Sequence, residues 1–261
     1  MKFEGKTALV SGSTSGIGLG IARHLAIGGC TVILNSHEAE DEVEDIRAGL
    51  EKETGARVQF RRADATRPEQ IAALVEDVAT ELGTVDILVN NVGMQHIDAI
   101  PDFPLDVWNQ VQAINLGAAL HFTKAVLPGM VGQEWGRVVN IASALGLVAA
   151  PFKSAYVSTK HGLIGLTKVT ALEVAQSGVT CNAICPGYVW TPLVEKQVAD
   201  QARTRNIPEE RVIEDVFMAS QPIDRFVRIE EVAALAGYLC SDIAAAITGA
   251  AIPIDGGCTA Q

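Results

Sequence analysis

The 261-residue sequence lacks any apolar run long enough to cross a membrane, and its start, Met1–Lys6, lacks the apolar core of a signal peptide. It also has little positive charge, since 20 lysines and arginines stand against 31 aspartates and glutamates, for a net charge of −11. A negative field repels nucleic-acid phosphates and anionic lipids. We therefore expect neither a nucleic-acid nor a membrane partner.

Cysteine occurs in an odd number and in no Cys-x-x-Cys pair, which argues against a disulfide framework and indicates a reducing, cytoplasmic compartment. Two cysteines lie in the apolar, strand-like run 179–185, where we expect them to be small buried residues. The histidines form no metal-ligand spacing with the cysteines, so we expect no metal. The cysteines are Cys30, Cys181, Cys185, Cys240 and Cys258, and the histidines are His24, His37, His96, His121 and His161.

What the sequence does contain is a regular alternation of short apolar runs and longer helical stretches. Most runs are apolar on both faces, which is typical of parallel strands covered by helices on both sides. No linker or repeat divides the chain, so we predict a single domain over 1–261, an α/β fold with a doubly wound sheet of about seven strands. The predicted strands are 6–11, 31–34, 57–61, 85–90, 137–141, 179–185 and 251–254, and the predicted helices are 17–28, 39–54, 68–82, 105–130, 155–176 and 229–240.

One segment, 191–227, breaks this alternation. It is polar and charged, and it contains Pro192, Pro208 and Pro222. It follows the carboxyl end of a predicted strand, where an insertion can cover a binding site. We therefore predict a helical lid at this place.

A glycine-rich turn, Gly12-Ser13-Thr14-Ser15-Gly16-Ile17-Gly18, follows the first predicted strand and opens the first helix. Gly12 permits the tight turn, while Gly16 and Gly18 permit close approach of the backbone to a pyrophosphate. The phosphates would meet the helix N-terminus, so Gly12, Thr14, Ser15, Gly16, Ile17 and Gly18 are candidate contacts. A glycine turn alone is weak evidence for a nucleotide site. Here its position between a strand and a helix favours a Rossmann-type dinucleotide site over a purely structural turn.

The end of the second strand, Asn35-Ser36-His37-Glu38, bears on which nicotinamide dinucleotide binds. A 2′-phosphate favours an arginine there, whereas a 2′-hydroxyl favours an acceptor. The stretch contains no arginine or lysine, and Asn35 or Glu38 can accept a hydrogen bond. NAD is therefore favoured over NADP.

Tyr156 and Lys160 stand four residues apart in a predicted helix, so their side chains share one face. A nearby ammonium favours the phenolate, which would make Tyr156 a proton-transfer group near neutral pH. The alternative is a half-buried tyrosine beside a surface lysine, because such helical pairs are common. Asp64 and Asn91 follow predicted strands at the edge where open α/β sheets bind ligands, although both residue types also form turns and helix caps.

Together these motifs resemble the short-chain dehydrogenase/reductase family over essentially the whole chain. They are Gly12-x3-Gly16-x-Gly18, Asp64, Asn90-Asn91-x-Gly93, Asn115, Ser143, Tyr156-x3-Lys160 and Pro186-Gly187…Thr191. The resemblance implies a catalytic tetrad of Asn115, Ser143, Tyr156 and Lys160. It implies that Asp64 meets the adenine, Asn91 the ribose region and Thr191 the nicotinamide amide, with Ala65, Gly93, Pro186, Gly187 and Val189 beside them. It further implies a homotetramer with a two-fold interface built from the helices that hold Asn115 and Tyr156.

Further segments resemble the bacterial (R)-3-hydroxybutyrate dehydrogenases within that family, namely 94–96, 151–156, 186–188, 191–197 and the tail 255–261. This resemblance implies that Gln95, Lys153 and Gln197 hold a substrate carboxylate. The chemistry agrees, because a small anion needs a cation and amide donors around it. The alternative for Lys153 is a surface lysine on a loop. Ser143, Leu145, Tyr156, Tyr188 and Cys258 would complete the substrate pocket.

Two positions depart from those dehydrogenases, which typically have histidine in place of Leu145 and tryptophan in place of Cys258. Leu145 cannot donate to a carboxylate, and Cys258 fills far less volume than an indole. Both changes make the pocket more apolar and roomier. The hypothesis is that the enzyme accepts a longer or differently spaced oxo acid, or binds 3-hydroxybutyrate weakly.

The predicted activity is reversible NAD-dependent hydride transfer between (R)-3-hydroxybutyrate, or a related longer hydroxy acid, and acetoacetate or the matching oxo acid. Tyr156 would take the alcohol proton, with its pKa lowered by Lys160. Ser143 would hydrogen-bond the substrate oxygen, and Asn115 would hold a water that relays the proton. One alternative is a family member acting on a 3-oxoacyl thioester, a sugar or a polyol, and another is a non-catalytic dinucleotide-binding regulator.

Overall fold

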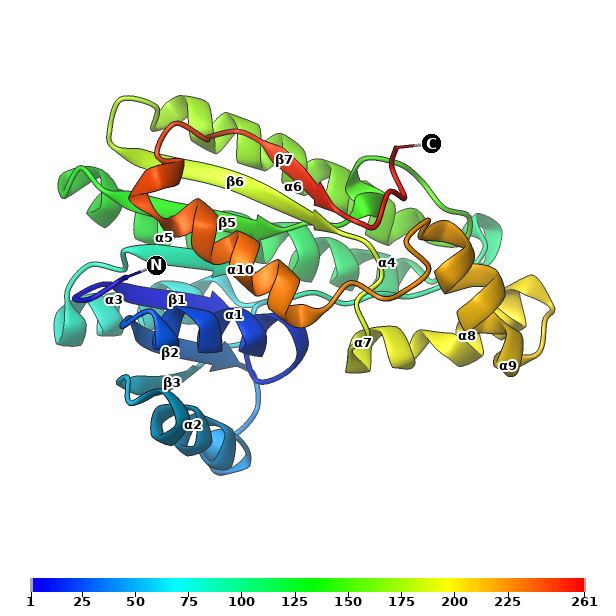
Figure 1. Ribbon diagram of the computed structural model, residues 1–261, viewed down its shortest axis with the longest axis horizontal. Coiled ribbons are helices and arrows are strands. Elements are labelled where there is room, and N and C mark those ends of the chain that lie inside the picture. The colour runs from blue at the N-terminus through cyan, green and yellow to red at the C-terminus, as the bar shows by residue number, and fades with distance from the viewer. Residues whose placement is uncertain (1, 261) are drawn as a thin grey trace.

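The computed structural model describes residues 2–260. Within them, seven parallel strands form one sheet in the order β3-β2-β1-β4-β5-β6-β7 (Figure 1). The strand order reverses between β1 and β4, and such a switch leaves a crevice at the carboxyl ends of the strands. The strands are β1 (Thr7–Ser11), β2 (Thr31–Ser36), β3 (Val58–Arg62), β4 (Ile87–Asn90), β5 (Gly136–Ile141), β6 (Val179–Pro186) and β7 (Ala251–Ile254).

Helices cover both faces of this sheet (Figure 1). Side chains of a strand point alternately to its two faces, so Ala8 and Val10 contact one apolar layer while Leu9 contacts the other. The first layer contains residues of α1, α2 and α10, and the second contains residues of α3, α5 and α6. The helices are α1 (Gly16–Ile27), α2 (Glu40–Thr54), α3 (Pro68–Leu82), α4 (Leu105–Gln112), α5 (Ala118–Gly132), α6 (Ser154–Glu173) and α10 (Ile229–Cys240).

The lid segment, residues 191–227, is helical as predicted, and it projects beyond the carboxyl ends of the strands (Figure 1). It has a small apolar core of its own, formed by Val194, Ala202, Val212 and Phe217. That core explains how a polar segment holds a defined shape beside the main domain. Its elements are α7 (Pro192–Glu195), α8 (Gln197–Arg205), α9 (Glu209–Val212), the π-helical turn η4 (Ile213–Phe217) and the 3₁₀ turn η5 (Met218–Ser220).

The predicted fold class and strand positions are confirmed, and most element ends agree within two residues. The long helix predicted over 105–130 is present, but it is not α-helical throughout. A π-helical turn, η2 (Ala113–Gly117), separates α4 from α5, and the N–H of Ala118 donates to the carbonyl of Ala113. Such turns insert one extra residue into a helix and are frequent at functional sites. This turn contains Asn115, whose side chain bonds to the backbone of Met94.

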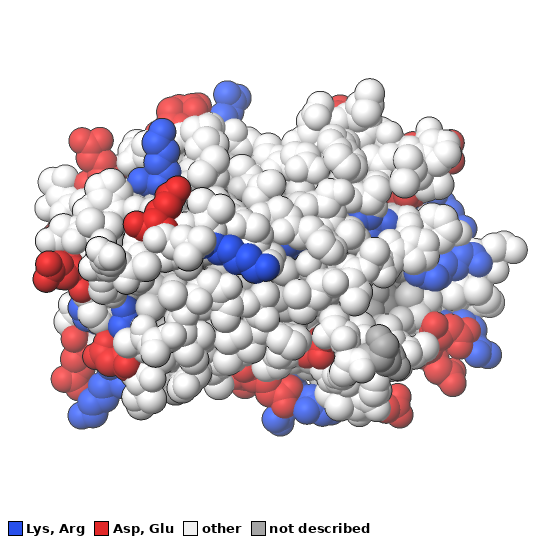
Figure 2. Space-filling model, turned by 90° about the horizontal axis from the view of Figure 1, so that it is seen from above, with Lys and Arg blue, Asp and Glu red and all other residues white. Residues whose placement is uncertain are grey.

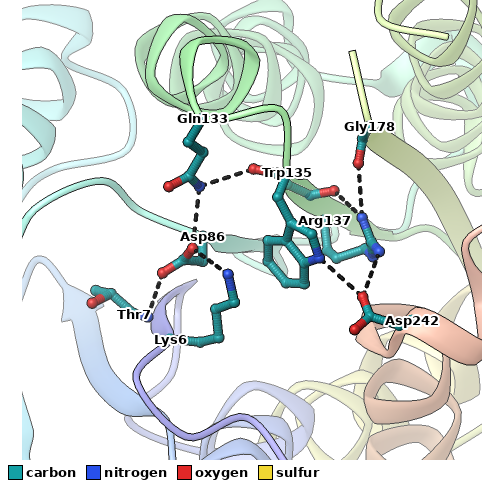
Figure 3. Close-up of polar contacts among 9 residues, drawn as sticks. Lys6, Thr7, Asp86, Gln133, Trp135, Arg137, Gly178 and Asp242 are labelled. Carbon is teal, nitrogen blue, oxygen red and sulfur yellow. Dashed lines mark hydrogen bonds and ion pairs between the residues drawn. The ribbon is translucent and has the colours of Figure 1, made fainter. Parts of the chain in front are cut away.

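The amino ends of the strands are closed by a polar cluster, shown in Figure 3. Asp86 accepts hydrogen bonds from the Lys6 ammonium (3.0 Å), the backbone N–H of Thr7 (2.8 Å) and the Gln133 amide (3.1 Å). Nearby, Arg137 donates to Asp242 (3.1 Å) and to the carbonyl of Gly178 (3.0 Å). The ring of Trp135 lies between the two cations, with Lys6 Nζ 3.7 Å and Arg137 Cζ 4.4 Å from its centroid.

The cysteines behave as predicted in the part of the chain that the structure describes. All five are free thiols, and Cys181 and Cys185 are fully buried. None of the helices formed by residues 2–260 combines the length and the apolar character that a membrane crossing requires.

Candidate active site

A cavity of about 890 Å³ opens at the carboxyl ends of the strands, between the sheet and the lid segment. It brings together the predicted site residues from β1, β2, β3, β4, β5, α6 and β6. All the cofactor-binding, substrate-binding and catalytic residues predicted from the sequence line it, except Gly18 and Asn115. Those two lie behind the cavity wall: Gly18 packs against the turn after β1, and Asn115 bonds to the backbone of Met94.

The glycine turn after β1 has the backbone that only glycine adopts easily. Gly12 and Gly16 have φ angles of +59° and +55°. A Cβ on Gly12 would lie 2.9 Å from the Cα of Val92, and one on Gly16 would lie 3.3 Å from the Thr191 methyl. A Cβ on Gly18 would collide with the carbonyl of Gly12, so Gly18 serves the packing of α1 against the turn. The turn is therefore a tight cradle at a helix N-terminus, which fits the pyrophosphate of a dinucleotide.

Asn91 holds this cradle in place. Its amide donates to the carbonyls of Ser11 (3.1 Å) and Gly12 (2.8 Å), which ties the end of β4 to the turn after β1. The Ser11 hydroxyl donates to the Val89 carbonyl and accepts the backbone N–H of Asn91. Ser11 was not among the predicted site residues, although its place at the end of a central strand is a signal that could have found it.

A cation from β3 that the sequence reasoning missed, Arg62, contacts the loop after β2. Arg62 Nε donates to the carbonyl of His37 (3.0 Å), because Arg62 pairs with Ser36 across β3 and β2. The Asn35 amide joins the same two strands by donating to the Arg61 carbonyl (3.0 Å), and Glu38 accepts from the Ser36 hydroxyl (3.0 Å). The prediction considered only the loop itself, whereas in-register pairing brings in a residue from the neighbouring strand.

Asp64 lies at the carboxyl end of β3 and lines the cavity. Its carboxylate accepts hydrogen bonds from the backbone N–H and the hydroxyl of Thr66, both at 2.8 Å. These bonds, the backbone one first, hold the pKa of Asp64 below its ordinary value. The group is therefore an ionised acceptor at neutral pH.

Tyr156 and Lys160 lie on α6, one turn apart, and Ser143 follows β5. Lys160 Nζ donates to the carbonyl of Ile141 (2.8 Å) and lies 5.5 Å from the centre of the Tyr156 ring. Burial lowers the pKa of Lys160 to about 8. Burial also raises the pKa of Tyr156, and a hydrogen bond with Ser143 opposes that rise. The pKa of Tyr156 thus lies above its ordinary value, contrary to the predicted lowering by Lys160, because desolvation of the phenolate is the largest cause of the shift.

Asn115 is 2% exposed and forms a closed pair with the backbone of Met94. Its carbonyl oxygen accepts the Met94 N–H (2.8 Å), and its amide donates to the Met94 carbonyl (2.9 Å) and the Thr159 hydroxyl (3.3 Å). Thr159 in turn donates to the carbonyl of Tyr156 (2.8 Å). The side chain thus fixes the chain after β4 against α6, and its polar atoms are engaged in that contact.

At the substrate end, Lys153 is buried, with 1% of its surface exposed. Its ammonium donates to Gln197 Oε1 (3.2 Å) and the Tyr188 hydroxyl (3.3 Å). Burial, and then the charge of Arg205, lower its pKa to about 7. The acidic residues of the cavity wall, Glu38 and Asp64, both lie at the opposite end, by β2 and β3. The surface-lysine alternative is therefore wrong, and among residues 2–260 the hydrogen-bond partners of the buried Lys153 ammonium are neutral oxygens.

The remaining predicted pocket residues surround Lys153. Gln95 reaches the cavity next to Met94, and within the described residues its buried Nε2 has no hydrogen-bond partner. Leu145 and Cys258 supply apolar wall, and Tyr188 stacks on Phe217 of the lid segment with ring centroids 4.6 Å apart. Prediction missed Gln201 and Arg205 on α8, although they follow Gln197 by one and two helical turns.

Comparison with known proteins gives concordant results. A family model described as enoyl-(acyl carrier protein) reductase matches residues 12–259. A D-beta-hydroxybutyrate dehydrogenase of Rhizobium meliloti (strain 1021) is 52% identical over 256 residues, covering 98% of this chain and 99% of that protein. A D-beta-hydroxybutyrate dehydrogenase of Cupriavidus necator is 49% identical over 261 residues, covering 99% and 100%.

Solved structures share the fold along the full chain. L-sorbose reductase from Gluconobacter frateurii, in complex with NADPH and L-sorbose, superposes with a TM-score of 0.92 at 30% identity, over 100% of this chain and 99% of that one. A variant of actinorhodin polyketide ketoreductase with NADPH gives a TM-score of 0.93 at 35% identity, over 100% of both chains. The shared sheet and the cradle place this chain among proteins that bind a nicotinamide dinucleotide.

Proposed function

Since the chain belongs to the short-chain dehydrogenase/reductase family and is an oxidoreductase, we propose that it interconverts (R)-3-hydroxybutyrate, or a closely related hydroxy acid, with the matching oxo acid. The observation that carries the proposal is the buried Lys153, which shares its cavity with Ser143 and Tyr156 and has no acidic partner in the described part of the chain. A buried ammonium beside neutral oxygens is unfavourable until an anion joins it. The relatives named D-beta-hydroxybutyrate dehydrogenase support the same substrate class.

The cradle of Gly12 and Gly16 at the start of α1, together with Asp64, would hold a nicotinamide dinucleotide. When bound, that cofactor supplies the hydride acceptor or donor. We propose NAD as the cofactor, because Glu38 offers an acceptor for a ribose hydroxyl. Arg62 beside His37 is a cation that would favour a 2′-phosphate, so the ratio of NAD to NADP use measures its influence.

Tyr156 and Ser143 would handle the proton and the charge on the reacting oxygen. Burial favours the protonated phenol, so in the reducing direction Tyr156 donates its proton to the developing alkoxide. In the oxidising direction the phenol must first lose that proton, and oxidation is therefore expected to accelerate as the pH rises. The Ser143 hydroxyl would donate to the same substrate oxygen.

The substrate carboxylate would lie between Lys153, Gln197 and Gln95. Gln197 Oε1 and the Tyr188 hydroxyl already orient the Lys153 ammonium, and Gln95 Nε2 is an unused buried donor. Asn115 acts on this set indirectly, since its bonds to Met94 fix the backbone next to Gln95. It is thus a positioning residue, and a water held in the proton path at Asn115 stays a prediction.

A homotetramer is proposed from surface chemistry. The exposed side of α5 and α6 carries Leu120, Val169 and Leu172, and between the two helices lies an apolar hollow lined by Leu116 and Leu166. Figure 2 shows the face that lies above α6 and β7 in Figure 1, where charged side chains gather mainly at the borders. Such a face suits burial between subunits. Residence in the cytoplasm is inferred from the free thiols.

The test is a substrate panel assayed with NAD and NADP in parallel. It contains 3-hydroxy acids of four, five and six carbons, a polyol, and a 3-oxoacyl thioester. We expect turnover of the acids with NAD, with the longer acids accepted because Leu145 and Cys258 leave room. Tyr156→Phe should abolish turnover and keep NADH binding, measured by cofactor fluorescence. Turnover of the thioester or polyol alone, or full activity of the variant, would contradict the proposal.

A further inference from the structure

The lid helix α8 presents a polar face to the cavity. Gln197, Gln201 and Arg205 follow one another at intervals of four residues, so their side chains share one face of the helix. Gln197 and Gln201 are buried, and Arg205 is half-buried and lines the cavity wall. Each glutamine oxygen meets a cation: Gln197 Oε1 accepts from Lys153 (3.2 Å), and Gln201 Oε1 accepts from Arg205 Nε (2.9 Å).

The two cations lie close together. Arg205 Cζ is 5.8 Å from the centre of the Phe152 ring, and Phe152 precedes Lys153 in the chain. The charge of Arg205 also contributes to lowering the pKa of Lys153 and opposes the rise in the pKa of Tyr188. Two positive charges that share a partly buried site repel each other, and the arrangement becomes favourable when an anion binds between them.

Within residues 2–260, neither Lys153 nor Arg205 forms an ion pair, although the chain carries a net charge of −11. Arg203, two residues earlier on the same helix, is 55% exposed and pairs with Asp200 (3.3 Å) and Asp98 (3.7 Å). Gln201 Nε2 is, in addition, a buried donor without a hydrogen-bond partner in the described part of the chain. The face of α8 that carries Gln197, Gln201 and Arg205 therefore has an unpaired Gln201 donor and an Arg205 charge without an acidic partner among residues 2–260.

We propose that Arg205 is a specificity-determining residue, a second cation carried by the lid segment that binds the substrate carboxylate together with Lys153. This inference rests on the proposed function, because it deepens the account of the same pocket. Leu145 in the cavity wall cannot donate a hydrogen bond, so Arg205 is the donor that takes up the rest of the carboxylate, and Gln201 orients it from behind the wall by accepting from Arg205 Nε. Arginine stays charged at every physiological pH, whereas Lys153 with a pKa of about 7 is only partly charged at neutral pH.

The experiment compares Arg205→Gln with Arg203→Gln, its matched control on the outer side of α8. The substrates are acetoacetate and the uncharged ketone 4-hydroxy-2-butanone, each reduced with NADH. In Arg205→Gln we expect KM for acetoacetate to rise by about ten- to a hundredfold, as for loss of a hydrogen bond to a charged group. The kcat for acetoacetate and the KM for the neutral ketone should change less than threefold. Arg203→Gln should match the wild type, and Arg205→Lys should fall between.

The pH profile distinguishes a charge effect from a merely structural one. In the wild type, KM for acetoacetate should rise above about pH 7 as Lys153 loses its proton. Removing the repelling charge in Arg205→Gln raises the pKa of Lys153, so the rise should begin at a higher pH. Burial raises the pKa values of Tyr156, Tyr188 and Cys258 at this end, and these groups stay uncharged over this range. Lys160, with a pKa of about 8, also titrates here, but it is present in both proteins, so the readout is the difference between the two profiles. A loosened lid would raise KM without moving the profile, and that result would overturn the inference.

A binding measurement separates this inference from the proposed function. Butyrate has the carboxylate but no reacting hydroxyl, and its dissociation constant can be measured by calorimetry in the presence of NAD. Tighter binding of butyrate to the wild type than to Arg205→Gln, without turnover of any hydroxy acid, would refute the proposed function and support the role of Arg205. Normal turnover of acetoacetate with equal constants in wild type, Arg205→Gln and Arg203→Gln would refute the role of Arg205 and leave the function standing.

Discussion

Buried cations at the two ends of the strands differ in their partners. We call the amino ends of the strands, around Asp86, the amino edge, and the carboxyl ends, around Lys153, the carboxyl edge. At the amino edge, each cation has an acid: Lys6 pairs with Asp86 at 3.0 Å and Arg137 with Asp242 at 3.1 Å (Figure 3). At the carboxyl edge, Lys153 has only an amide oxygen and a phenol, although it is more deeply buried than Lys6. At the amino edge each of these cations has a carboxylate partner, whereas Lys153 gains one only when an anion binds.

This difference indicates what each edge contributes. A paired cluster such as that of Asp86 stabilises the fold, because its members satisfy one another. A buried lysine without an acid destabilises the fold, and the same free energy becomes available to a ligand that compensates the charge. Substitution of Asp86 should therefore lower stability and leave activity unchanged, whereas substitution of Lys153 should lower activity and raise stability.

The largest effect is expected at Lys153. Lys153→Met removes the buried ammonium and should lower kcat/KM for acetoacetate by about a thousandfold, in line with the loss of a buried charge partner. The same change should raise the free energy of unfolding by about 1–3 kcal/mol, because an apolar side chain replaces an uncompensated charge. Steady-state kinetics and chemical denaturation of one protein sample measure both. Loss of activity together with loss of stability would show that Lys153 is a structural residue.

A smaller effect with the opposite pattern is expected at Asp86. Asp86→Ala leaves the Thr7 N–H, the Lys6 ammonium and the Gln133 amide without their acceptor, and it should cost about 2–4 kcal/mol of unfolding free energy. The kcat/KM should stay within twofold at a temperature where the variant is folded. Glu53→Gln, which breaks the exposed pair of Arg23 and Glu53, is the control and should cost less than about 1 kcal/mol. If both variants lost the same free energy of unfolding, the amino-edge cluster would stabilise the fold no more than an exposed ion pair does.

Much of the fold and of the cavity wall follows from local sequence signals. Alternating apolar runs and helices specify a parallel sheet, and the parallel direction places Gly12, Asp64, Asn91 and Ser143 at one edge without knowledge of any distance. That is why nearly all the predicted site residues line a single cavity. The prediction worked because each of these residues sits at the end of its own strand.

The features that sequence did not reveal depend on contacts between distant segments. Arg62 reaches the loop after β2 through strand pairing, and Arg205 reaches Lys153 through the fold of the lid segment, whose polar composition hides its helical period. The pKa of Tyr156 was predicted in the wrong direction, because spacing along a helix records a neighbouring charge but not the depth of burial. Asn115 was correctly placed inside a long helix, but the π-helical turn and the bonds of Asn115 to Met94 were not predicted, since no local sequence pattern indicates them.

The smallest expected effect is a pH dependence of stability that belongs to the carboxyl edge. Burial lowers the pKa of Lys153 to about 7 and of Lys160 to about 8, against 10.5 for an ordinary lysine. Above those values the unfolded chain binds more protons than the native one, so unfolding free energy should rise with pH, by about 1 kcal/mol per unit between pH 7 and 9.

Buried thiols reverse that trend at higher pH. Burial raises the pKa of four thiols, to about 12 for Cys30 and Cys181, to about 11 for Cys185, and upward for Cys240 as well. Above about pH 9 the native chain therefore holds protons that the unfolded chain has lost, and these four groups together outweigh the two lysines, so stability should fall again. Denaturation curves from pH 6 to 10 should therefore show a maximum near pH 9. Lys153→Met should flatten the rise, whereas Asp86→Ala should lower the whole curve and keep its shape. The slope of unfolding free energy against pH is set by the edge that carries the uncompensated charge. If the slope remained in Lys153→Met and disappeared in Asp86→Ala, that charge would lie at the amino edge, and the comparison would be wrong.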